Sequence, residues 1–86
     1  MGSARIRPDR LREKLAAVRK KLGYSQAEMA FFLSDDHVSV ARQDIHRYEN
    51  GEMGPSIIIL LRYSRMVKVP MEVFADDNLN LPKDFK

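Results

Sequence analysis

Cysteine is absent from the 86-residue sequence. The chain therefore has no disulfide framework, no thiolate metal site and no cysteine nucleophile, and packing alone must stabilise its fold. Long hydrophobic runs are absent too: the longest wholly aliphatic stretch is Ile57–Leu61, whereas a transmembrane helix needs roughly 20 apolar residues. Residues 1–14 are rich in arginine and have no apolar core, which argues against a secretory signal peptide. These absences exclude a membrane span and predict a cytoplasmic protein.

Patterns typical of catalysis and metal binding are also missing. The sequence has no glycine-rich phosphate loop and no serine placed beside a histidine, so we expect no enzyme activity. His37 follows Asp35 and Asp36, but three such residues on one loop lack the geometry of a closed metal site. We expect neither a metal nor a cofactor.

Length and composition indicate one small globular domain. Of the 86 residues, 44% are hydrophobic and 31% are charged, as in soluble globular proteins. The net charge is only +3, yet residues 1–22 carry eight basic and two acidic residues and account for +6. Such a segment is commonly a solvated tail, but it is also suited to following nucleic-acid phosphates. We divide the chain into a basic arm (1–8), a helical domain (9–75) and a tail (76–86).

The spacing of apolar residues predicts that the domain is all-α. A first helix over about 9–22 is indicated by apolar positions three and four residues apart: Leu11, Leu15, Val18 and Leu22. Ser25 and Glu28 have the spacing of a capping box, which begins a second helix. The apolar face of this helix is expected to contain Met29, Ala30, Phe32 and Leu33. The polar segment Ser34–Ser39 then breaks the helical pattern.

The third predicted helix, over about 41–49, is mostly polar. Its only large apolar residues are Ile45 and Tyr48. Because such a helix contributes little to a small core, its polar face is expected to have a function. Asn50–Gly51 ends it. A buried fourth helix over 57–67 follows, and then a short fifth helix that contains Met71, Val73 and Phe74.

Four fragments carry a further signal. They are Leu22–Ala30 (LGYSQAEMA), Asp44–Gly51 (DIHRYENG), Pro55–Ser56 and Lys68–Phe74 (KVPMEVF). In this order they resemble the Cro/repressor (XRE-like) family of bacterial and phage regulators. The resemblance covers about residues 9–75 and implies a five-helix, lambda-repressor-like helix-turn-helix domain. In such a domain the second helix lies across the DNA backbone and the third enters the major groove.

The resemblance implies DNA contacts at defined positions. The groove-facing positions fall on Arg42, Gln43, His46 and Arg47. The chemistry of these side chains agrees, because arginine can donate two hydrogen bonds to guanine and glutamine can bond adenine. Contacts to the DNA backbone are implied for Ser25, Gln26, Asn50 and Ser56, to which we add Arg5 and Arg7 of the basic arm. Arg19 and Glu49 match a structural salt bridge between the first and third helices.

Two features depart from the family pattern. Ser34–Ser39 lengthens the turn between the second and third helices, which is tight in the family. This longer turn leaves open where the third helix starts and, with it, which of Ser39, Ala41 and Arg42 reaches DNA. Asp35 and Asp36 would repel phosphate, so they are expected to point away from DNA or to cap a helix. Glu52 stands where the family commonly has a basic residue.

The sequence leaves two functions open. The first is a sequence-specific transcriptional regulator, repressor or activator, that binds a pseudo-palindromic site as a homodimer. Part of Ile57–Leu61, or Tyr63 and Met66, would then form the dimer face. The second is an antitoxin-like or adaptor protein that binds a partner protein through the 34–39 loop or the C-terminal tail.

Overall fold

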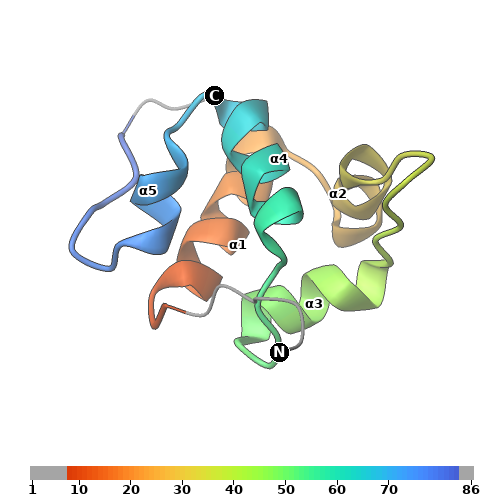
Figure 1. Cartoon of the computed structure of the whole chain (residues 1–86), viewed down its shortest axis with the longest axis horizontal. Coiled ribbons are helices and arrows are strands. Elements are labelled where there is room, and N and C mark those ends of the chain that lie inside the picture. The colour runs from red at the N-terminus through yellow and green to blue at the C-terminus, as the bar shows by residue number, and fades with distance from the viewer. Residues whose placement is uncertain (1–7, 84–86) are drawn as a thin grey trace.

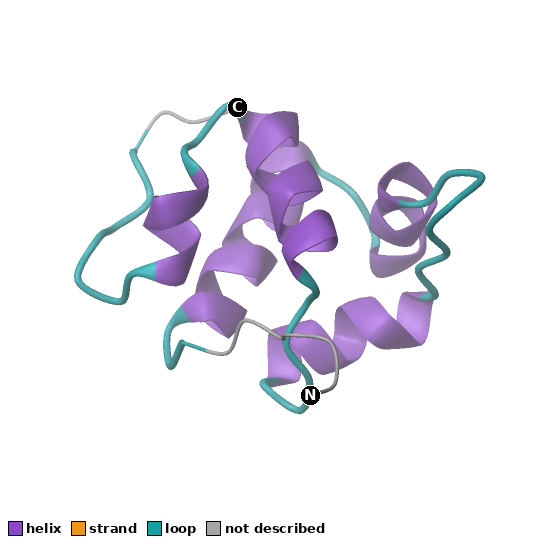
Figure 2. Ribbon diagram, viewed as in Figure 1, coloured by secondary structure: helices purple, strands orange, loops and turns teal. Residues whose placement is uncertain are grey.

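The computed structural model describes residues 8–83. Helices joined by loops make up this part of the chain, which contains no strand (Figures 1 and 2). The prediction of an all-α, five-helix fold is therefore confirmed. The helices are α1 (Leu11–Leu22), α2 (Gln26–Leu33), α3 (Arg42–Asn50), α4 (Ile57–Val67) and α5 (Met71–Ala75).

The helices pack around one shared core. α3 packs against α2 and α1, while α5 packs against α4 and α1. In Figure 1, α1 and α4 occupy the middle of the molecule, with α5 on one side and the α2–α3 pair on the other. α3 runs along an edge of the molecule, so that none of the other described helices covers one of its sides (Figure 2).

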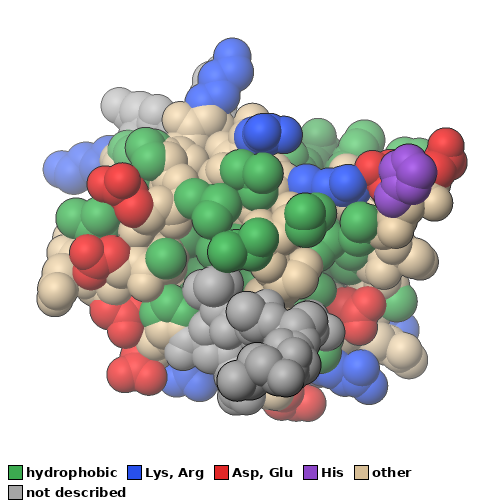
Figure 3. Space-filling view, viewed as in Figure 1, with side chains coloured by type: hydrophobic (Ala, Val, Ile, Leu, Met, Phe, Trp, Pro, Cys, Tyr) green, Lys and Arg blue, Asp and Glu red, His purple; other side chains and the backbone are tan. Residues whose placement is uncertain are grey.

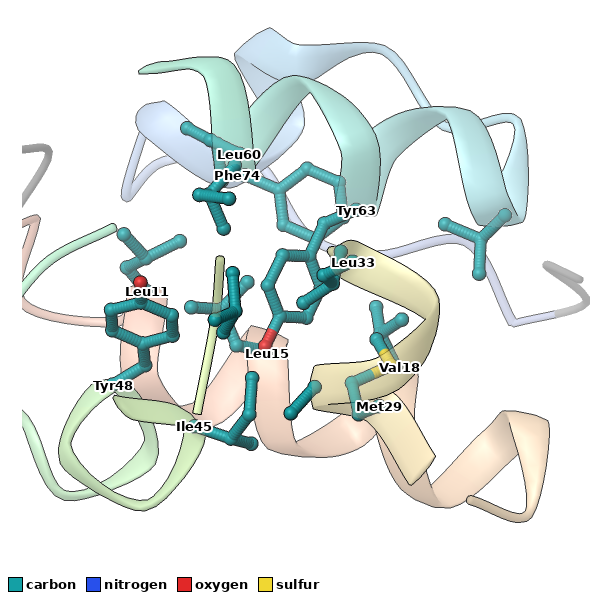
Figure 4. Packing of buried hydrophobic residues seen from close by; sticks show 14 of the residues in the cluster. Leu11, Leu15, Val18, Met29, Leu33, Ile45, Tyr48, Leu60, Tyr63 and Phe74 are labelled. Atoms are coloured by element: carbon teal, nitrogen blue, oxygen red, sulfur yellow. The ribbon is translucent and has the colours of Figure 1, made fainter. Parts of the chain in front are cut away.

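Every helix contributes apolar side chains to the core. Tyr63, Phe74 and Leu15 are among its largest fully buried members (Figure 4). Burying a side chain of this size contributes about 1.5–3 kcal/mol. The other hydrophobic core residues are Leu11, Val18, Met29, Ala30, Leu33, Val40, Ile45, Tyr48, Ile59, Leu60, Val67 and Val69.

Local hydrogen bonds set the ends of α2 and α3. Ser25 and Glu28 form the predicted capping box: the Ser25 hydroxyl accepts from the Glu28 N–H at 3.0 Å, and the Ser25 N–H donates to Glu28 Oε1 at 2.8 Å. α3 begins directly after Ala41, whose N–H donates to the Asp44 carboxylate at 2.9 Å. Gly51 ends α3 with a left-handed φ of 77°, a conformation that a Cβ atom disfavours.

The structure corrects two predictions about aromatic side chains. Phe32 is 51% exposed rather than part of the buried face of α2. Helical periodicity places it to one side of the buried residues Met29, Ala30 and Leu33, where its ring stacks on Tyr24 with 4.8 Å between the centroids. Tyr63 is fully buried, so it is not available for a dimer face. Ile57 and Ile58, in contrast, are 50% and 49% exposed.

The C-terminal tail stabilises the start of α1. The helix begins at Leu11 rather than near residue 9. The Asp77 carboxylate accepts the N–H groups of Asp9 and Arg10 at 2.9 and 3.0 Å, and the Arg10 guanidinium donates to Asn80 Oδ1 at 2.6 Å. A carboxylate at this position also interacts favourably with the helix dipole. The tail residues as far as Asn80 are therefore attached to the helical domain.

Lys14 is buried, which the sequence analysis did not predict. It lies on the core-facing side of α1 and only 3% of the residue is exposed. Its Nζ donates to the carbonyl oxygens of Val73 at 2.7 Å and Asp76 at 3.0 Å. Carbonyl groups at a helix end lack N–H partners within the helix, so Lys14 caps α5 and holds it against α1. Burial lowers the pKa of the Lys14 ammonium group.

Tyr63→Phe is expected to stabilise the protein. Among the described residues, the Tyr63 hydroxyl is a buried polar group without a hydrogen-bond partner, and an unsatisfied buried group costs about 1–3 kcal/mol. Removing it should raise the melting temperature, because about 1 kcal/mol corresponds to about 4–8 °C in a domain of this size. Thermal unfolding followed by circular dichroism measures the change. Tyr24→Phe, at a half-buried position, is the control, and a lower midpoint for Tyr63→Phe alone would contradict the expectation.

Candidate nucleic-acid interface

The outer face of α3 presents all the side chains that were predicted to read bases. They are exposed: Arg42, Gln43, His46 and Arg47. Ile45 and Tyr48 project from the opposite face of the helix and are buried in the core. This division follows from helical periodicity, which places residues three and four apart on one side. The core residues thus anchor α3 while its polar side remains accessible.

Arg47 is held only weakly within the protein. Its side chain is 50% exposed and its Nη1 lies 3.8 Å from the Asp44 carboxylate, one turn earlier in α3. Exposed ion pairs of this kind contribute about 0–1 kcal/mol. Arg47 can therefore exchange Asp44 for a ligand at small cost. Asp44 keeps its separate bond to the Ala41 N–H at the start of α3.

His46 and Asn50 form a hydrogen-bonded pair on the same face. The Asn50 side-chain amide donates to His46 Nε2 at 2.9 Å and to Glu52 Oε2 at 3.3 Å. When Nε2 accepts, the neutral imidazole carries its proton on Nδ1 and presents a donor to its surroundings. The predicted backbone contact of Asn50 would compete with these bonds, because both amide hydrogens already have acceptors.

The other residues predicted to contact the DNA backbone lie at helix starts. The Ser25 and Ser56 hydroxyls accept from the N–H groups three residues later, in α2 and α4. Each hydroxyl keeps its own hydrogen for a further acceptor such as a phosphate oxygen. The Gln26 amide donates to Glu49 Oε1 at 3.3 Å. Arg5 and Arg7 lie outside the described residues.

Arg19 and Glu49 form the ion pair expected between α1 and α3. Arg19 Nε donates to Glu49 Oε2 at 2.7 Å, and Nη2 donates to Glu49 Oε1 at 2.9 Å. The two side chains are only 16% and 9% exposed. Arg19 Nη1 also donates to the Tyr24 carbonyl at 3.0 Å, and the hydrogen bonds that Arg19 donates to the Glu49 carboxylate raise the pKa of Arg19. One guanidinium thus connects α1, the start of α2 and the end of α3.

Asp35 organises the lengthened loop between α2 and α3. Its Oδ1 accepts the N–H groups of His37 at 2.8 Å and Val38 at 2.9 Å. Its Oδ2 accepts from Arg62 Nη2 at 2.6 Å, and Arg62 Nη1 donates to the Leu33 carbonyl at 2.9 Å. Asp35 therefore neither caps a helix nor stays unpaired, since it joins the loop to α4.

Ser34 holds the two ends of the loop together. Its hydroxyl donates to the Ala30 carbonyl at 2.8 Å and accepts from the Val40 N–H at 2.8 Å. Val40 is buried in the core. The inserted residues therefore form a fixed connection that determines where α3 begins, with Arg42 as its first residue.

The Asp35 carboxylate is expected to titrate well below an ordinary aspartate. Hydrogen bonds from the His37 N–H, from Arg62 and from the Val38 N–H lower its pKa from 3.8 to about 2. A lowered pKa in the folded state means that Asp35 stabilises the fold above about pH 4, and that this contribution is lost as the pH falls toward 2. Carboxyl ¹³C NMR across this pH range measures the titration directly. A midpoint near 3.8 would show that these hydrogen bonds do not form in solution.

Arg12 is a site residue that the sequence analysis missed. It is exposed and lies against Gly51, where an added Cβ would come within 3.0 Å of Arg12 Cδ. Arg12 thereby places a positive charge beside the end of α3. Glu52 is the residue that follows Gly51 there. The available signal was a basic residue in the first turn of a helix, but local spacing does not reveal that this turn lies against α3.

No helix within residues 8–83 is long and apolar enough to cross a bilayer. The same residues contain no group of three or more His, Cys, Asp or Glu side chains placed to hold a metal ion. Asp35, two residues before His37, accepts hydrogen bonds from backbone N–H groups and from Arg62 instead.

The capped α2, the connecting loop and the anchored α3 with its exposed polar face define a helix-turn-helix protein. A family model described as Helix-turn-helix (HTH_3) matches residues 15–74. The chain belongs to this family, and the resemblance to Cro/repressor-type proteins is confirmed. The family consists of DNA-binding helix-turn-helix regulators. We found no significant match among curated proteins or among solved structures.

Proposed function

We propose that the protein is a non-enzymatic, sequence-specific transcriptional regulator that reads the DNA major groove with α3. The observation that carries this proposal is the shared exposed face of Arg42, Gln43, His46 and Arg47 on a helix anchored by Ile45 and Tyr48. The major groove is wide enough to admit an α-helix. The proposal places the protein in the cytoplasm of a bacterium, where it reaches bacterial or phage DNA.

The proposed contacts divide into reading and positioning. Arg42 and Arg47 suit guanine O6 and N7, and Gln43 suits adenine N6 and N7, with about 1–3 kcal/mol of discrimination for each bidentate pair. Phosphate contacts position the helix without selecting sequence. We assign these to Arg12 and to the predicted residues Ser25, Gln26, Asn50, Ser56, Arg5 and Arg7.

We further propose that the active form is a homodimer. One α3 spans only a few base pairs, and a symmetric pair doubles the contacts on a pseudo-palindromic site. Ile57 and Ile58 directly follow Ser56 and are about half exposed (50% and 49%). Hydrophobic side chains gather over α4 on the face shown in Figure 3. This apolar area is the proposed dimer face.

In vitro selection from random duplex DNA, at low and at physiological salt, tests the proposal. A palindromic motif that is retained at physiological salt supports a dimeric, sequence-specific regulator, and its half-site spacing should be about 34–36 Å or a multiple of it. Recovery of unrelated sequences that bind only at low salt would indicate nonspecific phosphate binding and would contradict the proposal.

Protein binding on the same fold is the second candidate function. One observation favours it: Phe31 is 75% exposed and Phe32 is 51% exposed, next to the lengthened loop. Of the two partner surfaces predicted from the sequence, the tail is engaged by α1 through Asp77 and Asn80. The second candidate function therefore concerns α2 and the 34–39 loop.

A further inference from the structure

The outer side of α2 carries an aromatic cluster that no other described helix covers. Phe31 has the largest exposed fraction among the large hydrophobic residues described, at 75%. Its ring meets Phe32 edge to face at 5.3 Å between centroids, and Phe32 stacks on Tyr24 at 4.8 Å. Three aromatic rings in contact at a surface form a continuous apolar area, unlike a single exposed side chain.

Negative charge surrounds this cluster in the sequence. Between Lys21 and Arg42 the chain has Glu28, Asp35 and Asp36 but no lysine or arginine. Glu28 and Asp36 are exposed. Arg62 of α4 forms an ion pair with Asp35 and also donates to the Leu33 carbonyl, so its charge offsets that of Asp35. We call the set Phe31, Phe32, Glu28 and Asp36 the α2 surface.

The charge of the α2 surface disfavours two occupants. DNA is disfavoured because its phosphates would meet the exposed carboxylates of Glu28 and Asp36, while the nearby Arg62 is already paired with Asp35. A second copy of the chain in a symmetric dimer is disfavoured as well, since a two-fold contact brings the same patch of both copies together. Two acidic patches, each containing Glu28 and Asp36, would then face each other, and like charges across an interface are repulsive.

We propose that the α2 surface binds a different protein through a basic, apolar segment. Lysine or arginine side chains of that segment would pair with Glu28 and Asp36, and an aliphatic or aromatic side chain would pack on Phe31. Aromatic anchors with a charged rim are typical of such interfaces. This inference rests on the second candidate function and names its surface and the chemistry of its partner.

The α2 surface is held in place before any partner arrives. The capping box fixes the start of α2, and Arg62 binds both the Leu33 carbonyl at its end and Asp35 in the loop. Ser34 links the two ends of the loop. A surface ordered in advance loses little conformational entropy on binding. In Figure 1 this part of the molecule, α2 and the following loop, lies at the edge opposite α5.

Two synthetic amphipathic peptides of equal length and identical apolar face, one with lysine and one with glutamate on its polar face, test the inference. Each is titrated into the ¹⁵N-labelled full-length protein without DNA, because the lysine peptide would itself bind DNA. We expect the lysine peptide to shift the amide signals of residues 27–37, and the glutamate peptide to leave them in place.

Matched variants distinguish binding at the α2 surface from nonspecific electrostatic attraction of a basic peptide. Phe31→Ser and Asp36→Lys change exposed side chains and should each weaken binding of the lysine peptide about tenfold or more. Glu72→Lys changes an exposed acidic residue on α5; it is the matched control for Asp36→Lys and should leave the affinity unchanged. The inference is overturned if the glutamate peptide binds equally well, if the shifts fall on α3, or if Phe31→Ser binds like wild type. In vitro DNA selection is carried out separately with Phe31→Ser. Loss of sequence-specific DNA binding in that experiment would count against the regulator proposal and not against binding at the α2 surface.

Discussion

Replacing Arg47 by alanine is expected to weaken binding to the selected DNA site by about 1–3 kcal/mol, or about 5- to 150-fold. Arg47 lies on the exposed face of α3 and, within residues 8–83, forms an ion pair with Asp44 at the long distance of 3.8 Å. Because this ion pair is weak, it offsets little of the free energy that the DNA contact of Arg47 supplies. Because a bidentate arginine contact discriminates guanine from other bases, the variant should also accept other base pairs at one position of each half-site.

Competition binding with the selected site and with single-base variants of it measures both effects of Arg47→Ala. Gln26→Ala is the matched control, because a residue that positions the DNA backbone should weaken binding to all sequences similarly. An Arg47→Ala protein that keeps the full preference of wild type at every position would remove Arg47 from the reading role. Unfolding curves of the variants should match wild type, since Arg47 is half exposed.

Replacing Arg19 by alanine is expected to lower the free energy of unfolding by about 3 kcal/mol. The pair with Glu49 is bidentate and its side chains are only 16% and 9% exposed. Removing the arginine leaves the Glu49 carboxylate with the weaker contact from Gln26 at 3.3 Å, and it also removes the donor to the Tyr24 carbonyl. Breaking one partner of such a pair costs more than the pair contributes overall.

Denaturant unfolding of Arg19→Ala, Glu49→Ala and the double variant measures this expectation. The double variant should be destabilised by less than the sum of the two single variants. Each single variant leaves one charge without its partner, whereas the double variant removes both charges. Lys20→Ala, at the neighbouring exposed position of α1, is the control and should change stability by about 0.5 kcal/mol or less. An Arg19→Ala midpoint equal to that of wild type would mean that the ion pair does not form in solution.

Local signals in the sequence were sufficient to predict the helices. The Ser25–Glu28 capping box and the terminal Gly51 act within one turn, and the structure contains both. The exposed face of α3 could also be predicted, because Ile45 and Tyr48 define its buried side by their spacing. The base and backbone contacts made by this face stay predictions.

Contacts between distant segments were not predictable in the same way. Lys14 stands on the core side of α1, where its neighbours in sequence suggest only a charged surface residue, and its acceptors are 59 and 62 residues away. Phe32 fits a helical apolar face, yet it is half exposed and stacks on Tyr24, which precedes α2. Tyr63 is apolar enough to suit either a core or a dimer face, and only the packing of α4 against the other helices decides between them.

The bonds from Asp9 and Arg10 to Asp77 and Asn80 bring the two ends of the domain together. The folded chain is in effect a ring closed by hydrogen bonds. A covalent version of this ring, made by a cross-link between residues 9 and 77, would join segments that are already neighbours and would mainly restrict the unfolded chain. The cross-linked protein should therefore keep the α3 face intact while unfolding at a higher temperature.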